Sequence, residues 1–313
     1  MAEVPIPFEC AGTTLVGIAH LPNRAASCGV LILVGGPQYR IGSHRQFVLL
    51  ARELAARGVA VFRFDYRSMG DSAGAPTTFE DISLDIEAAI SAFFSVAPDL
   101  QQLVIWGLCD AASAALFYAH SDTRIRGLVL LNPWVRTEDG LARAYLRHYY
   151  LDRLRQPEFW KKLLSGAGSI RAMLGSLRDN IDRSRGATGA HSGAITDVTI
   201  RSLPDRMADG FERFRGKVLL ILSGNNDVVA QEFKDLGVTS KRWRKLLCRT
   251  SVQRRDLPYA NHTFSRKDWR NEVTMLTYEW VVGNFDADCG TPSLNHEARP
   301  NAQGMGPAGR AGL

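Results

Sequence analysis

The sequence has few cysteines and no pairing pattern among them. The five cysteines are scattered and odd in number, and no two form a C-x-x-C pair; they are Cys10, Cys28, Cys109, Cys248 and Cys289. This spacing argues against a disulfide framework and against a zinc site, and it favours a reducing compartment.

The chain also lacks long apolar runs and nucleotide-binding glycine motifs. No apolar run approaches the roughly 20 residues that span a bilayer. Residues Met1–Pro5 contain no basic region that leads into an apolar core, so we expect no signal peptide. Gly35 and Gly36 are followed by proline, which is not a dinucleotide fingerprint. We therefore predict a cytoplasmic protein without a transmembrane segment, and no metal or organic cofactor is implied.

The charge is basic overall and unevenly spread. The formal net charge is +6, and much of the excess lies in the stretch 241–255. Its basic residues are Lys241, Arg242, Arg244, Lys245, Arg249, Arg254 and Arg255. Such a run is usually a solvated helix face with its following loop, and the alternative is a patch for an acidic lipid or polymer. Trp243 is the only aromatic residue in it, so nucleic acid is not an expected partner.

What the sequence does contain is a regular alternation of apolar strands and helical segments. Its 313 residues suit one α/β domain with an insertion. Expected strands are 6–10, 14–19, 29–34, 59–64, 103–106, 125–131 and 217–222, and expected helices are 47–57, 79–94 and 269–282. The alternation predicts a mostly parallel central sheet flanked by helices.

One region interrupts the alternation. Residues 136–215 contain helical patterns and no clear apolar strand. An insertion there would lie above the carboxyl ends of the strands, where open α/β sheets bind ligands, so we interpret it as a helical lid. The alternative is a helical subdomain that only adds stability. The core is then 1–135 and 216–285, and the tail 286–313, which is low in large apolar residues, is predicted to be disordered.

The most informative motif is Gly107-Leu108-Cys109-Asp110-Ala111. It lies between the predicted strand at 103–106 and a small-residue helical run at 112–116. Strand, sharp turn and helix in this order fit the G-x-S-x-G nucleophile elbow of α/β-hydrolases, with cysteine in place of serine. Gly107 and Ala111 supply the small neighbours that such a turn needs. The motif predicts this fold and a thiol nucleophile, whereas the alternative is a small buried cysteine without reactivity.

An acid and a base follow the elbow in the chain order of this fold. Asp227 comes just after the predicted strand at 217–222, and His262 lies in a loop ahead of the last helix. We predict that His262 is the base and that Asp227 orients it. The alternatives are a loop histidine without a role, a helix cap at Asp227, and Glu138 or Asp139 as the acid.

Attack by a thiolate creates an oxyanion, which needs preorganised N–H donors. The elbow predicts the backbone N–H of Asp110 as one donor. Pro37 has no N–H, so the second donor comes from Gly36 or Gln38, and we favour Gln38. The position of Cys109 at a helix start favours its thiolate through the helix dipole.

Charged and aromatic residues near the predicted site are candidate binding groups. An Asp110 carboxylate beside the nucleophile would oppose thiolate formation, so we expect it to point away or to bind a basic loop residue such as Arg40, His44 or Arg45. Tyrosines of the predicted lid could line an acyl or sugar pocket, although such tyrosines more often belong to a core. The candidate substrate-binding residues are Arg40, His44, Tyr145 and Tyr149.

Three stretches of the sequence, 35–47, 64–72 and 107–113, carry a family resemblance. Each stretch alone is a moderately specific motif, and the three together are quite specific. Together they resemble the exosortase A system-associated hydrolase 1 family of bacterial α/β-hydrolases, over about residues 5–285. Ser68 and Ala111 stand where that family leads us to expect glycine. The family is associated with extracellular polysaccharide production and with sorting of proteins that carry a C-terminal export signal. The resemblance therefore implies a cellular context and not a substrate.

These observations lead to three functional hypotheses. The first is a cysteine-dependent hydrolase of an ester or thioester, acting on a small-molecule acyl substrate or on one linked to a glycan or lipid. The second is an acyltransferase that passes the same acyl group to a sugar or lipid hydroxyl, which a water-excluding lid would favour. The third is a non-catalytic binding protein that uses the stretch 241–255. A carboxylate nucleophile is discounted because Asp110 lies one residue from the elbow apex.

Overall fold

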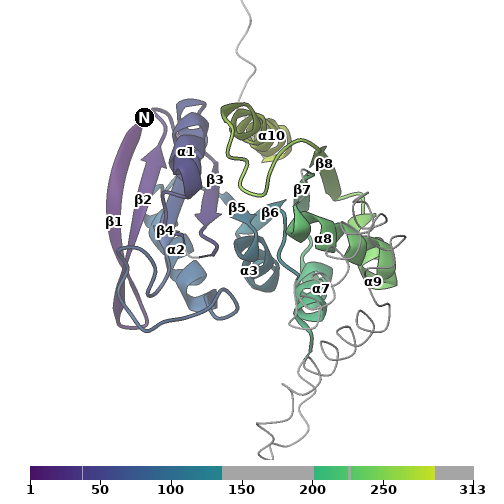
Figure 1. The fold of residues 1–313 in the computed structure, drawn as a ribbon. Helices are drawn as coiled ribbons and strands as arrows, with labels where there is room; N and C mark the ends of the chain where they lie inside the picture. Colours follow the sequence, from purple (N-terminus) through teal and green to yellow (C-terminus); the bar gives the residue numbers. More distant parts are fainter. Residues whose placement is uncertain (37, 136–200, 225–226, 286–313) are drawn as a thin grey trace, which may run out of the picture.

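The computed structural model describes residues 1–36, 38–135, 201–224 and 227–285, which form one eight-stranded sheet covered by helices on both faces (Figure 1). The strand order is β1-β2-β4-β3-β5-β6-β7-β8. β2 runs antiparallel to β1 and β4, and the remaining neighbours are parallel. The strands are β1 (Ala2–Cys10), β2 (Thr13–Leu21), β3 (Cys28–Leu33), β4 (Ala60–Asp65), β5 (Gln102–Leu108), β6 (Ile125–Leu131), β7 (Lys217–Ser223) and β8 (Val252–Leu257).

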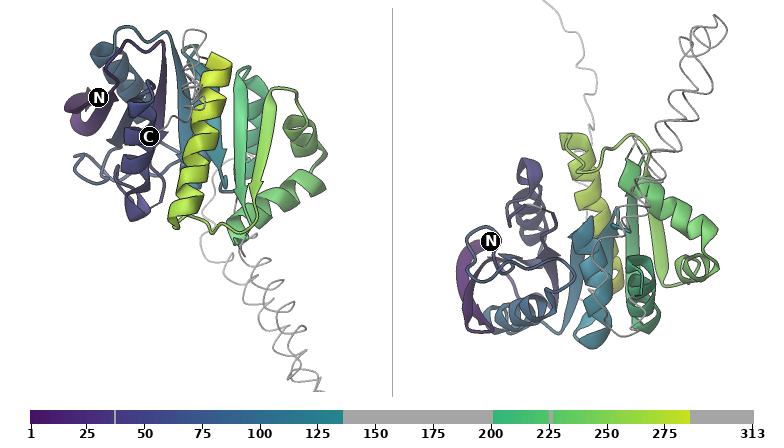
Figure 2. Two further views of the ribbon diagram at one scale, coloured as in Figure 1. Left: turned by 90° about the horizontal axis from the view of Figure 1, so that it is seen from above. Right: turned by 60° about the horizontal axis from the view of Figure 1, so that its bottom comes forward.

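The helices form two layers. α1 and α10 cover one face of the sheet, and α2, α3 and α7 cover the other, with α8 and α9 beside α7 at the β8 edge (Figures 1 and 2). The bounds are α1 (Gln46–Ala56), α2 (Ser83–Val96), α3 (Asp110–Tyr118), α7 (Leu203–Arg213), α8 (Val228–Thr239), α9 (Lys241–Leu247) and α10 (Lys267–Phe285), with short 3-10 helices at Ser43–Arg45 and Ala119–Ser121. Among the helices described here, none is both long and apolar enough to cross a membrane.

The central strands are apolar on both sides because both faces of the sheet are covered. Every residue of β3 and β4 is buried, as is β5 from Leu103 onward. Along β5 the side chains alternate between the layers: Ile105 packs with the α2–α3 side, and Trp106 packs with the α1–α10 side. These strands carry the elbow and its supporting loops at their carboxyl ends.

The sequence predicted the fold class and each of the seven strands correctly, and the structure adds β8. The helix expected at 79–94 begins later, at Ser83. A turn closed by the Asp81 N–H donating to Thr78 O at 2.9 Å precedes it, which keeps Phe79 out of the helix. The predicted apolar face is correct, since Ile82, Ile86, Ala89, Ile90 and Phe93 are all buried.

Part of the predicted insertion contributes to the core. α7 lies within 136–215 and buries Met207, Ala208 and Phe211. At Gly210 an added Cβ would lie 2.0 Å from the Leu116 carbonyl oxygen of α3, so the two helices are in close contact there. The rest of the predicted lid, 136–200, lies outside the described residues, and so does the tail 286–313. Tyr145, Tyr149 and the alternative acids Glu138 and Asp139 fall in that part.

The basic stretch 241–255 is largely used within the fold. Arg242 on α9 forms ion pairs with Asp209 and Glu212 of α7 at 2.5 and 2.8 Å. Arg254 pairs with Asp256 at 2.9 Å. Exposed pairs of this kind add little stability, but they match the interpretation of the stretch as a solvated helix face.

Candidate active site

Cys109 lies at the sharp turn between β5 and α3. Its backbone has φ 62° and ψ −125°, a strained conformation for a residue with a side chain. The turn is tight: a Cβ at Gly107 would lie 2.7 Å from backbone atoms of Ala111, so only glycine fits. Cys109 itself is partly exposed. The strand, sharp turn and helix predicted from the motif are therefore present.

Asp227 and His262 are in direct contact. The Nδ1 atom of His262 lies 2.9 Å from Oδ2 of Asp227. Asp227 follows β7 and also caps α8, where its Oδ1 accepts the Val229 N–H at 3.0 Å. The Asp227 side chain is 4% exposed and that of His262 is 32% exposed. The acid is thus shielded from solvent, whereas the imidazole is accessible to a ligand.

The environment of Asp227 favours its ionised form. Burial raises the pKa of this carboxyl, but hydrogen bonds from His262 and from the Ser223 hydroxyl oppose it, and the net pKa is lowered. An ionised Asp227 accepts a hydrogen bond from the Nδ1–H of His262, which leaves Nε2 as the acceptor in the neutral imidazole. This tautomer is the one that a general base requires.

Asn132 joins the segments that carry Asp227 and His262, and the sequence analysis did not identify it. It directly follows β6, is fully buried and has φ 43°, a region that asparagine tolerates better than most residues. Its Oδ1 accepts the Ser223 N–H at 2.8 Å, and its Nδ2 donates to the His262 carbonyl oxygen at 3.1 Å. An asparagine after an apolar strand was the only sequence signal for it.

The same segment also contacts the elbow. The Trp134 N–H donates to the Cys109 carbonyl oxygen at 3.2 Å, and the Ser113 hydroxyl donates to the Trp134 carbonyl oxygen at 2.6 Å. The Cys109 N–H donates to Leu131 O at 2.9 Å. Residues 131–134 therefore connect the turn of Cys109 to the segments that carry Asp227 and His262.

The Asp110 carboxylate binds backbone N–H groups. Its Oδ2 accepts the Gly36 N–H at 2.8 Å, and its Oδ1 accepts the Ala111 N–H at 2.9 Å. The expectation that it binds a basic loop residue is wrong, because these backbone donors already satisfy it. Burial raises the pKa of Asp110, and the N–H donors and the charge of His262 partly oppose that rise. The imidazole is thus within electrostatic range of the elbow.

The predicted second oxyanion donor is engaged elsewhere in this structure. The Gln38 N–H donates to the Gly36 carbonyl oxygen at 2.8 Å, and the Gln38 side chain accepts the Ser43 N–H at 3.0 Å. The Gly36 N–H is held by Asp110. His44, a candidate substrate-binding residue, is exposed with φ 54°.

A buried polar network anchors this loop to the sheet. Arg40 pairs with the buried Asp65 of β4 and with Asp71. Arg63, also on β4, donates to the Arg40 carbonyl oxygen at 3.0 Å and to Nε2 of the buried His20 at 2.8 Å. Arg40, predicted as a substrate-binding residue, is thus committed to holding the loop.

A parallel sheet with an antiparallel β2, an elbow after β5 and an acid–base pair after β7 and β8 together define an α/β-hydrolase. A model of the Alpha/beta hydrolase family matches residues 30–272 of the chain. The protein belongs to this family.

Similarity to individual proteins is weaker than the family match. The esterase Pf2001 of Pyrococcus furiosus shares the fold with a TM-score of 0.58 and 16% identity, over 90% of this chain and 92% of that one. The quorum-quenching protein AidA of Acinetobacter baumannii (strain MDR-ZJ06) is 26% identical over 147 residues, 45% of this chain and 46% of AidA. The polyketide transferase claH of Penicillium crustosum is 27% identical over 132 residues, 41% of this chain and 43% of claH. The match thus spans less than half of either curated relative.

Proposed function

We propose that the protein is a cysteine-dependent hydrolase of carboxylic esters or thioesters. Cys109 is the nucleophile, His262 the general base and Asp227 the acid that orients the base. The observation that carries the proposal is the 2.9 Å contact between His262 Nδ1 and Asp227 Oδ2, together with the strained elbow turn of Cys109. The substrate is a small-molecule acyl compound or an acyl group on a glycan or lipid.

The reaction has two steps through an acyl-enzyme. In the first step the Cys109 sulfur bonds to the carbonyl carbon while the thiol proton passes to His262 Nε2. The bond to the leaving group then breaks, and His262 donates that proton to the leaving alcohol or thiol. In the second step water attacks the thioester, its proton passes to His262, the carbon–sulfur bond breaks, and the sulfur regains the proton as the acid leaves.

Two electrostatic effects on the ionisation of the Cys109 thiol oppose each other. The N-terminus of α3 favours a thiolate at Cys109, and the nearby Asp110 carboxylate opposes it. We assign the Asp110 N–H as one oxyanion donor. The Gln38 N–H becomes the second oxyanion donor when its hydrogen bond to the Gly36 carbonyl oxygen opens. The Asp110 carboxylate holds the loop against the elbow by accepting the Gly36 N–H.

Intact-protein mass spectrometry after brief exposure to activated esters and thioesters of increasing chain length tests the proposal. We expect a mass increase of one acyl group on the native protein and none on Cys109→Ala. Cys248→Ala is the matched control, because Cys248 is an exposed cysteine at the C-terminal end of α9. An equal acyl mass on Cys109→Ala would refute the assignment of the nucleophile.

The iodoacetamide reaction across pH separates a narrow substrate range from an unreactive site. We expect alkylation of Cys109 at a pH below the ordinary thiol pKa of about 8.5. Asp227→Asn should move that profile towards the ordinary pKa, because the imidazole loses its orienting partner. A native profile at the ordinary pKa, without any adduct, would contradict the proposal.

Acyl transfer is the second candidate function. The specific observation in its favour is the match to claH, whose name is polyketide transferase. Transfer uses the same acyl-enzyme but replaces water with a sugar or lipid hydroxyl. Incubation of the acylated protein with candidate acceptors, followed by product analysis, separates the two, since hydrolysis yields the free acid and transfer an acylated acceptor.

The proposed cellular setting is the cytoplasm of a bacterium that produces extracellular polysaccharide. It rests on the resemblance of 35–47, 64–72 and 107–113 to the exosortase A system-associated hydrolases and on the scattered cysteines. Deletion of the gene should change polysaccharide yield, and Cys109→Ala should fail to restore it. Unchanged yield would remove the support for this setting.

A further inference from the structure

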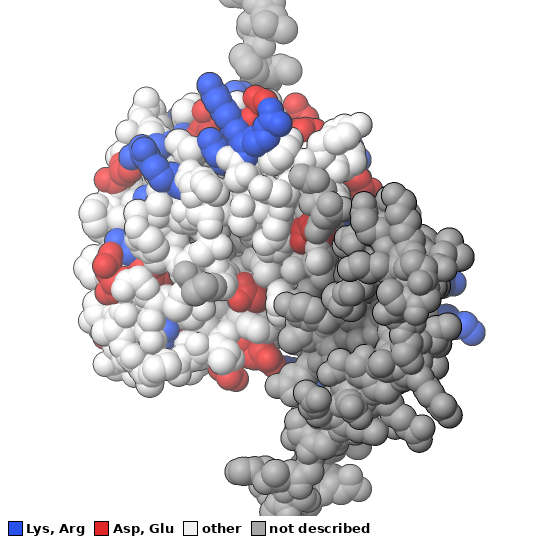
Figure 3. All heavy atoms as spheres, in the orientation of Figure 1, with Lys and Arg blue, Asp and Glu red and all other residues white. Residues whose placement is uncertain are grey.

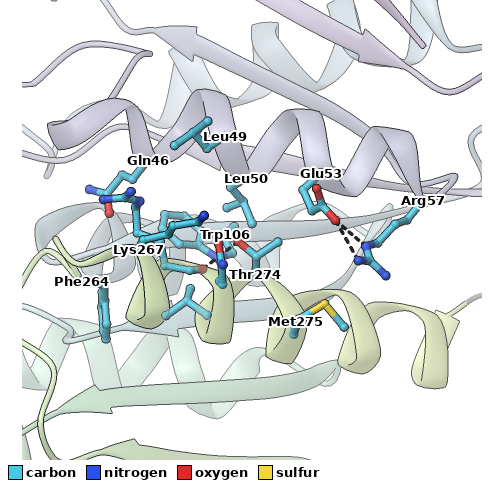
Figure 4. Close-up of a pocket in the computed structure, with 13 residues that line it drawn as sticks. Gln46, Leu49, Leu50, Glu53, Arg57, Trp106, Phe264, Lys267, Thr274 and Met275 are labelled. Carbon is cyan, nitrogen blue, oxygen red and sulfur yellow. Dashed lines mark hydrogen bonds and ion pairs between the residues drawn. The ribbon is translucent and has the colours of Figure 1, made fainter.

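A cavity of about 400 Å³ lies between α1 and α10. Figure 4 shows side chains of both helices facing each other across it, with Trp106 of β5 beneath. Neither Cys109, Asp227 nor His262 lines it. A pocket of this size accommodates a small organic molecule, so the groove is a candidate binding site separate from the proposed reaction centre.

Two buried donors in the cavity wall have no acceptor. Trp106 is 2% exposed and Gln46 is 7% exposed. Within the described ranges, the indole Nε1 of Trp106 and the side-chain Nε2 of Gln46 make no hydrogen bond. Buried donors are normally paired, because leaving them unpaired forfeits the hydrogen bonds that water would make. Both groups therefore favour a ligand that carries hydrogen-bond acceptors.

The charged residues around the cavity favour an anion. Lys267 and Arg270 line it from the first turn of α10. No ion pair of either is present among the residues that the structure describes, and the Arg270 guanidinium donates a hydrogen bond to the Ser265 carbonyl oxygen. The single carboxylate in the lining, Glu53, is already paired with Arg57 at 2.8 Å. Figure 3 shows basic side chains gathered on this side of the molecule, with acidic ones beside them.

Most of the remaining wall is apolar, with Asn271 and Thr274 as its polar members. Leu50 and Val273 are 4% and 5% exposed and face the cavity from α1 and α10. Leu49 lines it as well and is 40% exposed. A ligand with an apolar body would cover this surface while its head reaches the donors and the cations.

We propose that the α1–α10 groove binds a small organic anion, a carboxylate attached to an aliphatic body. The carboxylate accepts hydrogen bonds from Trp106 Nε1 and Gln46 Nε2 and lies beside the charges of Lys267 and Arg270. The aliphatic body covers Leu50 and its apolar neighbours. The ligand is held without chemical change, since the groove contains no nucleophile of the proposed reaction.

The groove adjoins the loop that carries the base. Phe264, two residues after His262, lines the cavity and has φ 50°, a strained conformation for an aromatic residue. A ligand in the groove thus contacts the segment that positions His262. This proximity gives the site a route to influence the proposed reaction without direct contact with the substrate.

Isothermal titration calorimetry of the full-length protein with three probes of equal chain length tests the proposal. The probes are octanoate, octanol and octylammonium. We expect saturable binding of octanoate, at least ten-fold weaker binding of octanol, and no saturation with octylammonium. Equal binding of octanoate and octanol would overturn the anion assignment, and absence of octanoate binding would overturn the site.

Variants locate the binding. Lys267→Glu should weaken octanoate binding at least ten-fold, and Lys245→Glu, a charge reversal at another exposed lysine, on α9, should not. Trp106→Phe keeps a ring in place but removes the indole donor, and it should weaken octanoate about five-fold. Because Lys267 is exposed, its reversal leaves the fold intact even if Trp106→Phe proves unstable. Octanoate affinity unchanged by Lys267→Glu would place the ligand elsewhere, including at the proposed reaction centre, and would refute the groove.

Discussion

Asn132 provides the sharpest test of how the site is held together. Replacement by alanine removes both side-chain hydrogen bonds and leaves the Ser223 N–H and the His262 carbonyl unpaired. Each unpaired buried group costs about 1–3 kcal/mol. Alanine at φ 43° adds about 1 kcal/mol of backbone strain. We therefore expect Asn132→Ala to lower the free energy of unfolding by about 3–7 kcal/mol.

Asn132→Gly separates the hydrogen bonds from the strain. Glycine adopts a positive φ without cost, so its loss should be about 1 kcal/mol smaller than that of alanine. Urea unfolding at neutral pH, followed by circular dichroism, measures both variants. A loss below about 1 kcal/mol for Asn132→Ala would refute the reasoning that these bonds are made in the folded protein.

Asn132→Asp tests the positioning of His262 rather than stability alone. Aspartate keeps the acceptor for Ser223 and tolerates the backbone conformation, but it loses the donor to His262 O. We expect the pH profile of Cys109 alkylation to shift towards an unperturbed thiol. Thr277→Ala, which removes a buried hydroxyl bonded to Val273 O at 2.8 Å, should destabilise the protein without that shift. Equal profiles in both variants would show that Asn132 is only structural.

Three further changes test the elbow, the acid and the loop anchor. Gly107→Ala should lower the free energy of unfolding by about 2 kcal/mol or more in thermal melts and abolish acylation, because the added Cβ would lie 2.7 Å from backbone atoms of Ala111. Gly283→Ala is the control and should be tolerated, since an added Cβ there has nothing within 4 Å. Ser223→Ala should raise the pKa of Asp227 towards its ordinary value and cost about 1 kcal/mol, so that this carboxyl contributes a smaller loss of stability on acidification. An unchanged acid limb in a pH series of urea melts would contradict this. Burial lowers the pKa of His20 from 6.5 to about 4. Between pH 6.5 and pH 4 this histidine is therefore protonated in the unfolded chain but neutral in the folded protein. Stability should be full above pH 6.5 and should fall by up to about 3 kcal/mol on acidification to pH 4, and His20→Gln should flatten that slope in the same melts.

Most of the fold could be predicted because its signals are local. Continuous apolar runs bounded by glycine or proline mark the buried strands, and the spacing of Ile86, Ile90 and Phe93 marks the covered face of α2. The elbow is local too, since strand, Gly107, Cys109 and the small-residue helix are contiguous. The start of α2 was misplaced because a backbone turn, and not side-chain periodicity, sets it.

Contacts between distant segments were beyond reach of the sequence. The chain order of the elbow, Asp227 and His262 indicated candidates, but their contact at 2.9 Å depends on how β7 and the loop after β8 meet. Asp110 looked like a partner for a basic side chain, and only the close approach of the loop after β3 showed that backbone N–H groups satisfy it. Asn132 carries no motif, because its role consists entirely of its partners 91 and 130 positions away.

The sequence by itself determined the α/β-hydrolase architecture and the positions of Cys109, Asp227 and His262 along the chain, because burial patterns and turn chemistry act over a few residues. The tertiary structure decided which polar groups meet. It showed that Arg40, a candidate substrate-binding residue, forms an ion pair with Asp65. It also formed the groove over Trp106 from α1 and α10, which are far apart in the chain. Hydrogen bonds and cavities depend on distances between packed elements, and those distances exist only once the sheet has brought the elements together.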